Sequence, residues 1–156
     1  MTQHPRLRAP MSPAVMPCQD AWIVDDSAAA RRLLGALIGR AGFSVVLFES
    51  GADAARAITD ADPHPALIVL DMQMEGLDGC TTARAIRRAG YAGPIALISA
   101  TTSPALVRRA LRAGADAALR KDAGFAGLRA WVAERFPATD DADASAAASP
   151  ASTPGG

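Results

Sequence analysis

Polar residues whose side chains suit phosphoryl chemistry close, or directly follow, short apolar runs in this chain. They are Asp25 and Asp26 after AWIV, Asp71 at the end of ALIVLD, Ser99 at the end of PIALIS, and Lys121 after AALR. If these runs are parallel strands of one sheet, their carboxyl ends lie along one edge, where ligands of such sheets bind. The sequence therefore predicts that these groups converge on a single site.

The three carboxylates are the residues that would bind a metal ion. Carboxylates brought together repel one another, and a divalent cation or protonation of one of them relieves the repulsion. Mg²⁺ is the natural candidate, because it prefers hard oxygen ligands and is typically held by one or two carboxylates plus phosphate oxygens. A structural alternative also fits Asp25 and Asp26, because Asp26 or Ser27 could cap the helical segment that follows.

Asp71 is the candidate nucleophile. Beside a bound cation its carboxylate could attack phosphorus and form an acyl phosphate, although an ordinary turn role after a strand also fits. Lys121 supports the chemical interpretation, since it is the single lysine among sixteen basic residues and its compact ammonium can meet a phosphoryl oxygen as a point charge. The hydroxyl of Ser99 could donate to another such oxygen, but a turn role fits Ser99 taken alone.

The elements that must position these residues alternate regularly along the chain. The apolar runs are residues 21–24, 44–48, 66–70, 95–98 and 117–119. Such uninterrupted runs are typical of parallel strands buried on both faces. Between them, Leu33 and Leu37 share a helical face before Gly42, and Ser103 with Pro104 marks a helix start. The alternation predicts an α/β fold, a doubly wound five-stranded parallel sheet with helices on both faces.

Length and composition set the outer limits. The 156 residues fit one domain, predicted at residues 21–136, whereas residues 1–20 and the Ala/Ser/Pro-rich residues 137–156 are predicted to be disordered tails. Acidic and basic residues balance to a net charge of zero, so we expect no direct nucleic-acid partner and no membrane partner. The absence of a signal peptide and of a membrane-length apolar run predicts a cytoplasmic protein.

Four segments together resemble the receiver domain of response regulators in two-component signal transduction. WIVDDS is similar to the family's first strand with its acidic pair, and LIVLDMQMEGLDG to its phosphoacceptor strand and loop. IALISA is similar to the switch strand and GADAALRK to the last strand with its lysine. The resemblance runs from about Trp22 to Val132 and implies the (βα)5 flavodoxin-like fold with strand order 2-1-3-4-5.

The resemblance also implies a role for each acidic residue. Asp71 would be the phosphoacceptor. Mg²⁺ would be bound directly by Asp26, Asp71 and the backbone carbonyl of Gln73, with Asp25 acting through water. Ser99 would report the phosphoryl group by moving toward it, and Lys121 would pair with a phosphoryl oxygen.

Three residues depart from the family pattern. Glu75 stands where proline is usual in the phosphoacceptor loop, which predicts a looser loop. Asp122 replaces the proline that usually follows the lysine, and we expect its charge to compete for the Lys121 ammonium. Ala118 replaces the aromatic residue that swings inward with the switch hydroxyl. The chemistry is thus predicted to be intact and the usual readout altered.

The predicted function is a signalling switch that catalyses only its own phosphorylation and dephosphorylation and is not an enzyme with a separate substrate. The resemblance implies a phosphohistidine donor, on a sensor histidine kinase or a histidine phosphotransfer protein. Because the residues after Pro137 lack hydrophobic periodicity, we expect no DNA-binding output domain, and output by binding an unknown downstream protein. Receivers often dimerise through their last two helices, so the resemblance leaves a homodimer open.

Two other classes of function remain open at this point. One is a pseudo-receiver, a protein-binding module with weak or no phosphorylation-dependent switching. The other is an enzyme on the same scaffold, such as a nucleotide binder or a haloacid dehalogenase-type phosphatase, which is disfavoured because the chain lacks nucleotide-binding glycine loops and a DxD after the first strand. Arg108, Arg109 and Arg112 form a basic strip that is either a solvated face or a partner contact.

Overall fold

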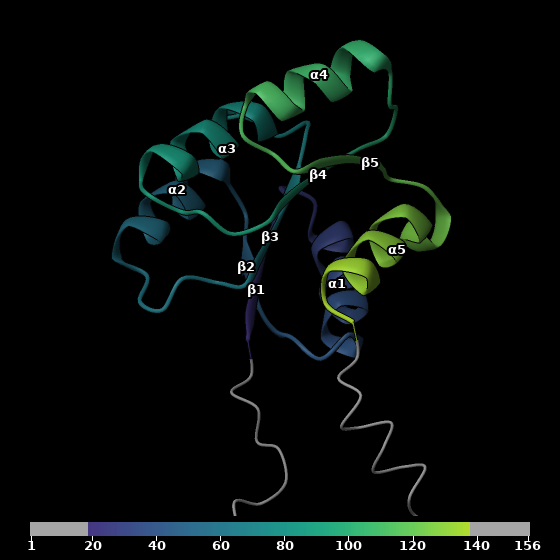
Figure 1. Cartoon of the computed structure of the whole chain (residues 1–156), viewed down its shortest axis with the longest axis horizontal. Coiled ribbons are helices and arrows are strands. Elements are labelled where there is room, and N and C mark those ends of the chain that lie inside the picture. Colours follow the sequence, from purple (N-terminus) through teal and green to yellow (C-terminus); the bar gives the residue numbers. More distant parts are fainter. Residues whose placement is uncertain (1–18, 138–156) are drawn as a thin grey trace, which may run out of the picture.

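Five parallel strands form the centre of the structure, in the order β2-β1-β3-β4-β5 (Figure 1). They are β1 (Asp20–Val24), β2 (Ser44–Phe48), β3 (Leu67–Asp71), β4 (Ile95–Ser99) and β5 (Ala117–Arg120). Every predicted strand is present with ends shifted by at most one residue, and the strand order 2-1-3-4-5 is confirmed.

The computed structural model describes residues 19–137. The tails predicted for residues 1–20 and 137–156 therefore lie almost wholly outside the described residues. Asp20 is an exception, because it is the first residue of β1 and pairs with Ser44 of β2.

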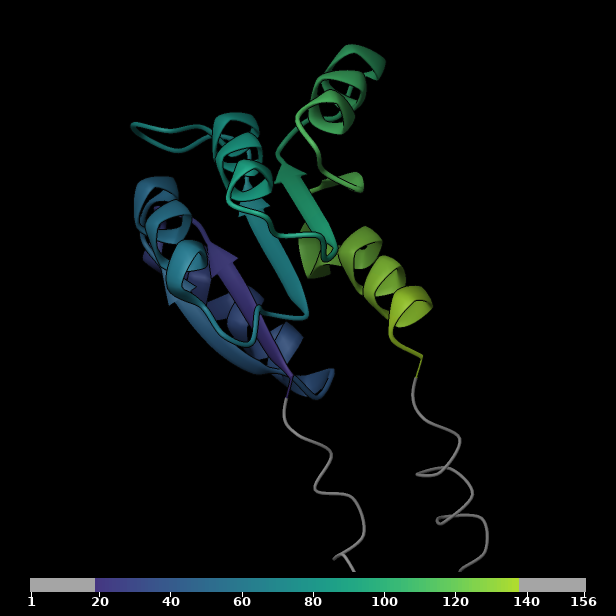
Figure 2. The ribbon, with the colours of Figure 1, turned by 60° about the vertical axis from the view of Figure 1, so that its left-hand side comes forward.

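Helices cover both faces of the sheet (Figures 1 and 2). They are α1 (Ala28–Arg40), α2 (Gly51–Asp60), α3 (Gly79–Arg88), α4 (Pro104–Arg112) and α5 (Ala126–Arg135), with a short 3₁₀ helix η1 (Ala123–Phe125) before the last. One hydrophobic cluster joins α1 and α5 to one face, and a second joins α2, α3 and α4 to the other. The predicted doubly wound fold is thus confirmed. Among residues 19–137, we find no helix long and apolar enough to cross a bilayer.

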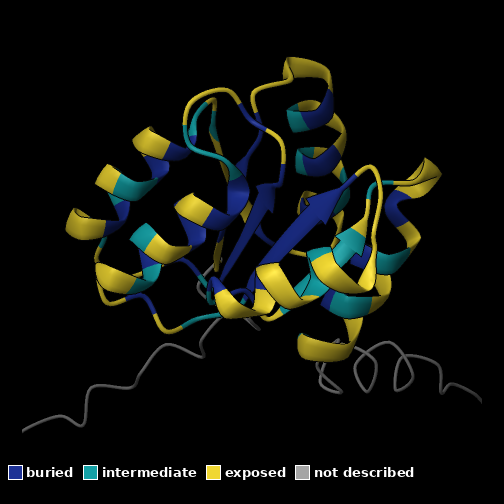
Figure 3. Cartoon of the chain, turned by 90° about the horizontal axis from the view of Figure 1, so that it is seen from above, coloured by how far each residue is buried: buried dark blue, intermediate teal, exposed yellow. Residues whose placement is uncertain are grey.

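Burial decreases from the centre of the sheet toward its edges (Figure 3). Every residue of β3 and β4 is buried, as is all of β1 except Asp20. In contrast, β2 and β5 contain no fully buried residue. The prediction of fully buried strands was wrong for these two, because an edge strand has a neighbour on one side only and its helices cover it incompletely.

Short polar side chains fix the starts of four helices, at the edge of the sheet where the strands end. The caps are Ser27, Ser50, Asp78 and Ser103, and each side chain accepts a hydrogen bond from a backbone N–H three residues on. The predicted cap at Ser103, with Pro104 in the first turn, is confirmed. Because Ser27 caps α1, the Asp26 side chain is not required for that role.

Candidate functional site

The polar residues predicted from the sequence lie together at the carboxyl edge of the sheet. Asp25 follows β1, Asp71 ends β3, and Ser99 ends β4. Lys121 follows β5, and its backbone N–H donates to the Ser99 carbonyl over 2.7 Å. The parallel register therefore brings residues from four strands to one place, as the sequence indicated.

The three carboxylates form a tight cluster. One oxygen from each of Asp25, Asp26 and Asp71 lies within 4.8 Å of the others. Their environments differ, because Asp25 is 0% and Asp71 6% exposed, whereas Asp26 is exposed to solvent. Two of the three negative charges are thus buried, and the third faces water.

Lys121 contacts both buried carboxylates. Its Nζ donates to Asp25 Oδ2 over 2.9 Å and lies 3.5 Å from Asp71 Oδ1. Partial burial acts to lower the pKa of Lys121, but the hydrogen bond to Asp25 and the charges of Asp71 and Asp25 raise it overall. The ammonium is therefore charged at neutral pH and aimed at the acceptor candidate.

The environment of Asp71 disfavours the ionised form of its carboxyl group. Burial raises its pKa, and the charge of Asp25 raises it further, while Lys121 and the Gln73 backbone act in the opposite direction. The balance is a raised pKa, because Lys121 and the Gln73 backbone do not fully offset the loss of solvent and the charge of Asp25. An additional cation at this position would stabilise the ionised form.

The cluster fits a divalent cation of the hard, oxygen-preferring type. Asp25 has both oxygens occupied, since Oδ1 accepts from the Ser27 N–H over 2.9 Å and Oδ2 from Lys121. Asp26 accepts one described hydrogen bond, at Oδ2 from the Glu75 N–H over 3.1 Å. Asp26 and Asp71 are therefore better placed to bind the cation directly, and Asp25 is better placed to contact it through a water molecule.

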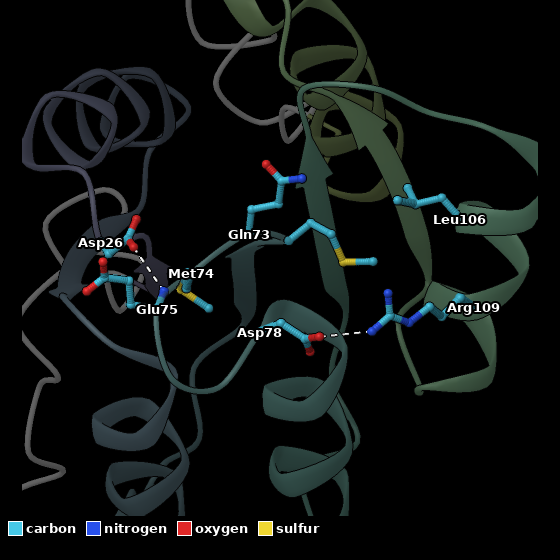
Figure 4. Close-up of a pocket in the computed structure, with 8 residues that line it drawn as sticks. Asp26, Gln73, Met74, Glu75, Asp78, Leu106 and Arg109 are labelled. Carbon is cyan, nitrogen blue, oxygen red and sulfur yellow. Dashed lines mark hydrogen bonds and ion pairs between the residues drawn. The ribbon is translucent and has the colours of Figure 1, made fainter.

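The loop that follows β3 borders a pocket of about 470 Å³ (Figure 4). Its lining comes from Asp26, from the loop itself, and from Leu106 and Arg109 of α4. Arg109 Nη2 lies 2.9 Å from Asp78 Oδ2, so α4 and the start of α3 are joined by an ion pair across this pocket. One member of the predicted basic strip is thus paired, and all three arginines of the strip are exposed.

Two of the departures noted in the sequence behave differently from expectation. Asp122 does not take the Lys121 ammonium from the site, because its Oδ1 accepts from the Ala126 N–H over 3.2 Å at the start of α5. Glu75 also makes a contact that was not expected, because its backbone N–H donates to Asp26, which a proline could not do. Ala118 is half-buried beside the α2–α4 cluster, as a small side chain with no rotamer to change.

Sequence reasoning missed one residue that supports the site. Arg31 of α1 donates from Nη1 to the Asp25 backbone carbonyl over 2.7 Å, and its Nη2 lies 3.6 Å from Glu49 Oε1. It thereby ties the acidic pair to the first turn of α1 and to the end of β2. The available signal was its position in the first turns of the helix that follows the acidic pair.

Comparison with known proteins identifies the family. A sequence model described as "Response regulator receiver domain" matches residues 21–133. The chain belongs to this family. Among solved structures, a chain of the CheX–CheY–BeF₃–Mg²⁺ complex from Borrelia burgdorferi superposes on the receiver with a TM-score of 0.70 at 25% identity, covering 77% of the receiver chain and 90% of that chain.

Curated relatives of the receiver are longer proteins. It is 38% identical over 101 residues to a gliding motility regulatory protein of Myxococcus xanthus, which covers 64% of this chain and 13% of the relative. It is 36% identical over 99 residues to the response regulator MprA of Mycobacterium sp. strain KMS, covering 64% of this chain and 42% of the relative. The receiver therefore spans less than half the length of these two relatives.

Proposed function

We propose that this receiver accepts a phosphoryl group on Asp71 from a phosphohistidine, with Mg²⁺ bound by Asp26, Asp71 and the backbone carbonyl of Gln73. The donor is a sensor histidine kinase or a histidine phosphotransfer protein. The observation that carries the proposal is the clustering of three carboxylates within 4.8 Å, with the Lys121 ammonium 3.5 Å from Asp71. The similarity to a BeF₃–Mg²⁺ complex of a CheY-containing assembly adds support.

The chemistry follows from the positions of these side chains. A carboxylate oxygen of Asp71 attacks phosphorus, a P–O bond forms, and the P–N bond to the donor imidazole breaks. Lys121 exchanges part of its contact with Asp25 for a phosphoryl oxygen, and the Ser99 hydroxyl donates to a second oxygen. When bound, Mg²⁺ supplies positive charge that offsets the charge of the phosphoryl oxygens.

The output is a protein-protein contact and not turnover of a separate substrate. Ala118 offers no aromatic side chain to reposition, so we propose that the signal leaves the site through backbone shifts and rearrangement of helices. The zero net charge favours a protein partner over direct contact with nucleic acid or membrane. A cytoplasmic location is part of the same proposal, which leaves a homodimer open.

Phosphorylation by a small-molecule donor tests the proposal directly. Intact mass is measured after incubation with Mg²⁺ and acetyl phosphate, for the parent and for Asp71→Asn. We expect a gain of one phosphoryl group, about 80 Da, on the parent alone. A parent that gains no mass and binds no Mg²⁺ would refute the phosphoacceptor role, and would favour the pseudo-receiver, for which Ala118 already gives a structural reason.

A further inference from the structure

Asp26 is the least restrained carboxylate of the cluster. Asp25 is fixed by Ser27 and Lys121, and Asp71 faces Lys121. Among the described residues, Asp26 has one such restraint, the 3.1 Å hydrogen bond from the backbone N–H of Glu75 (Figure 4). An exposed aspartate without this restraint would rotate freely, and binding a cation would then cost the entropy of fixing it.

The loop that carries Glu75 is itself held in place on both sides. The Gly79 N–H donates to the Met72 carbonyl over 3.0 Å, which closes the loop at its base. Asp78 caps α3, and Gly76 has a positive φ of 81° that turns the chain directly after Glu75. The N–H of Glu75 is thus presented from a fixed backbone and not from a mobile side chain.

We propose that the backbone N–H of Glu75 is a positioning group for the divalent cation, holding the Asp26 carboxylate beside Asp25 and Asp71 before the cation arrives. The proposal rests on the proposed function, because it assigns Asp26 to the cation. One oxygen of Asp26 accepts from the N–H, and the other is left for the metal. The hydrogen bond therefore tightens cation binding by preorganisation, and the Glu75 side chain is not needed for this effect.

A pair of substitutions separates the backbone from the side chain. Glu75→Pro removes both the N–H and the carboxylate, whereas Glu75→Ala removes the carboxylate alone. The Mg²⁺ dissociation constant of each variant is measured by calorimetry with MgCl₂, and urea unfolding checks that both are folded. We expect Glu75→Pro to bind Mg²⁺ about 3- to 10-fold more weakly than Glu75→Ala, which is the effect of losing one hydrogen bond of ordinary strength at a solvent-exposed carboxylate.

A second readout excludes a general disturbance of the loop. In an Asp26→Ala background, the same two substitutions at Glu75 should have nearly equal Mg²⁺ affinities, because the side chain that accepts from the Glu75 N–H is gone. With acetyl phosphate, Glu75→Pro should need more Mg²⁺ for half-maximal phosphorylation than Glu75→Ala, while the rates at saturating Mg²⁺ agree.

The outcomes distinguish this proposal from the function on which it rests. A parent protein that binds no Mg²⁺ refutes both. A parent that binds Mg²⁺, with equal affinities in Glu75→Pro and Glu75→Ala, refutes the positioning role alone. Tighter binding by Glu75→Pro also refutes it, because the N–H would then compete with the metal for Asp26. A Glu75→Pro defect that persists in the Asp26→Ala background shows a loop effect and likewise refutes it.

Discussion

Replacing Lys121 with methionine should destabilise the domain, because it leaves a buried carboxylate without its cation. Asp25 is fully buried, and the Nζ–Oδ2 distance of 2.9 Å shows a direct charged hydrogen bond. Removing one member of a buried ion pair typically costs about 3–5 kcal/mol. The Lys121 side chain is 24% exposed, so solvent screens part of the interaction, and we expect a loss of about 2–3 kcal/mol.

Urea unfolding followed by far-UV circular dichroism measures this loss. For a domain of this size a denaturant slope of about 1–3 kcal/mol per molar urea is usual, so the midpoint should fall by about 0.7–3 M, and by about 1–1.5 M at a slope of about 2. Arg120→Met is the matched control, because Arg120 is an exposed neighbour that also loses one positive charge. We expect that control to stay within about 0.5 kcal/mol of the parent.

A second substitution, at Asp25, gives the decisive comparison. Asp25→Asn in the Lys121→Met background removes the orphaned charge and should recover most of the lost stability. Added Mg²⁺ should stabilise Lys121→Met more than the parent, since it replaces the missing positive charge. If Lys121→Met were no less stable than Arg120→Met, or if Asp25→Asn gave no recovery, the reasoning on the buried pair would be wrong.

The remaining predictions concern the surroundings of the site. Arg87→Ala removes hydrogen bonds to three backbone carbonyls and the ion pair with Asp116, so urea unfolding should show a loss of about 2–3 kcal/mol that lysine does not restore. Gly79→Ala places a Cβ 2.6 Å from the Asp71 backbone oxygen, and an intact-mass time course with acetyl phosphate should show slower phosphorylation. Partial burial acts to raise the pKa of Asp78. The hydrogen bond from Thr81 and the charge of Arg109 in α4 outweigh burial and hold that pKa below its usual value. Its charge therefore stabilises the fold above pH about 4 and less as pH falls, so the difference in unfolding free energy between the parent and Asp78→Asn, about 0.5–1 kcal/mol at pH 7, should shrink in acid.

The central strands and the convergence of the site could be predicted because they depend on local pattern plus topology. Strands buried on both faces require uninterrupted apolar runs, and these are visible in the sequence around Ile23, Val69 and Leu97. Once the strands are parallel, Asp71 and Lys121 must reach the same edge whatever their separation in sequence. The burial of β2 and β5 was overestimated, because a run of apolar residues does not reveal which strands lie at the edge of a sheet.

The contacts within the site could not be predicted, because they depend on how separate elements face one another. Asp122 was expected to compete for Lys121, but its position before α5 gives it a nearer partner in a helix N–H. Glu75 reaches Asp26 across 49 residues of sequence, and Arg109 reaches Asp78 across 31. No periodicity encodes such pairs, since they follow from loop shape and from the placement of one helix against another.

The fall in burial from β3 to β5 bears on how this module can change in evolution. Asp71 lies at the end of a strand whose every residue is in the core, where substitutions leave cavities and are selected against. In α4 only Ala110 is buried, and β5 has no buried residue, so sequence drift there costs little stability. Substitutions are therefore tolerated more readily at the edge formed by α4 and β5 than around Asp71 at the centre of the sheet.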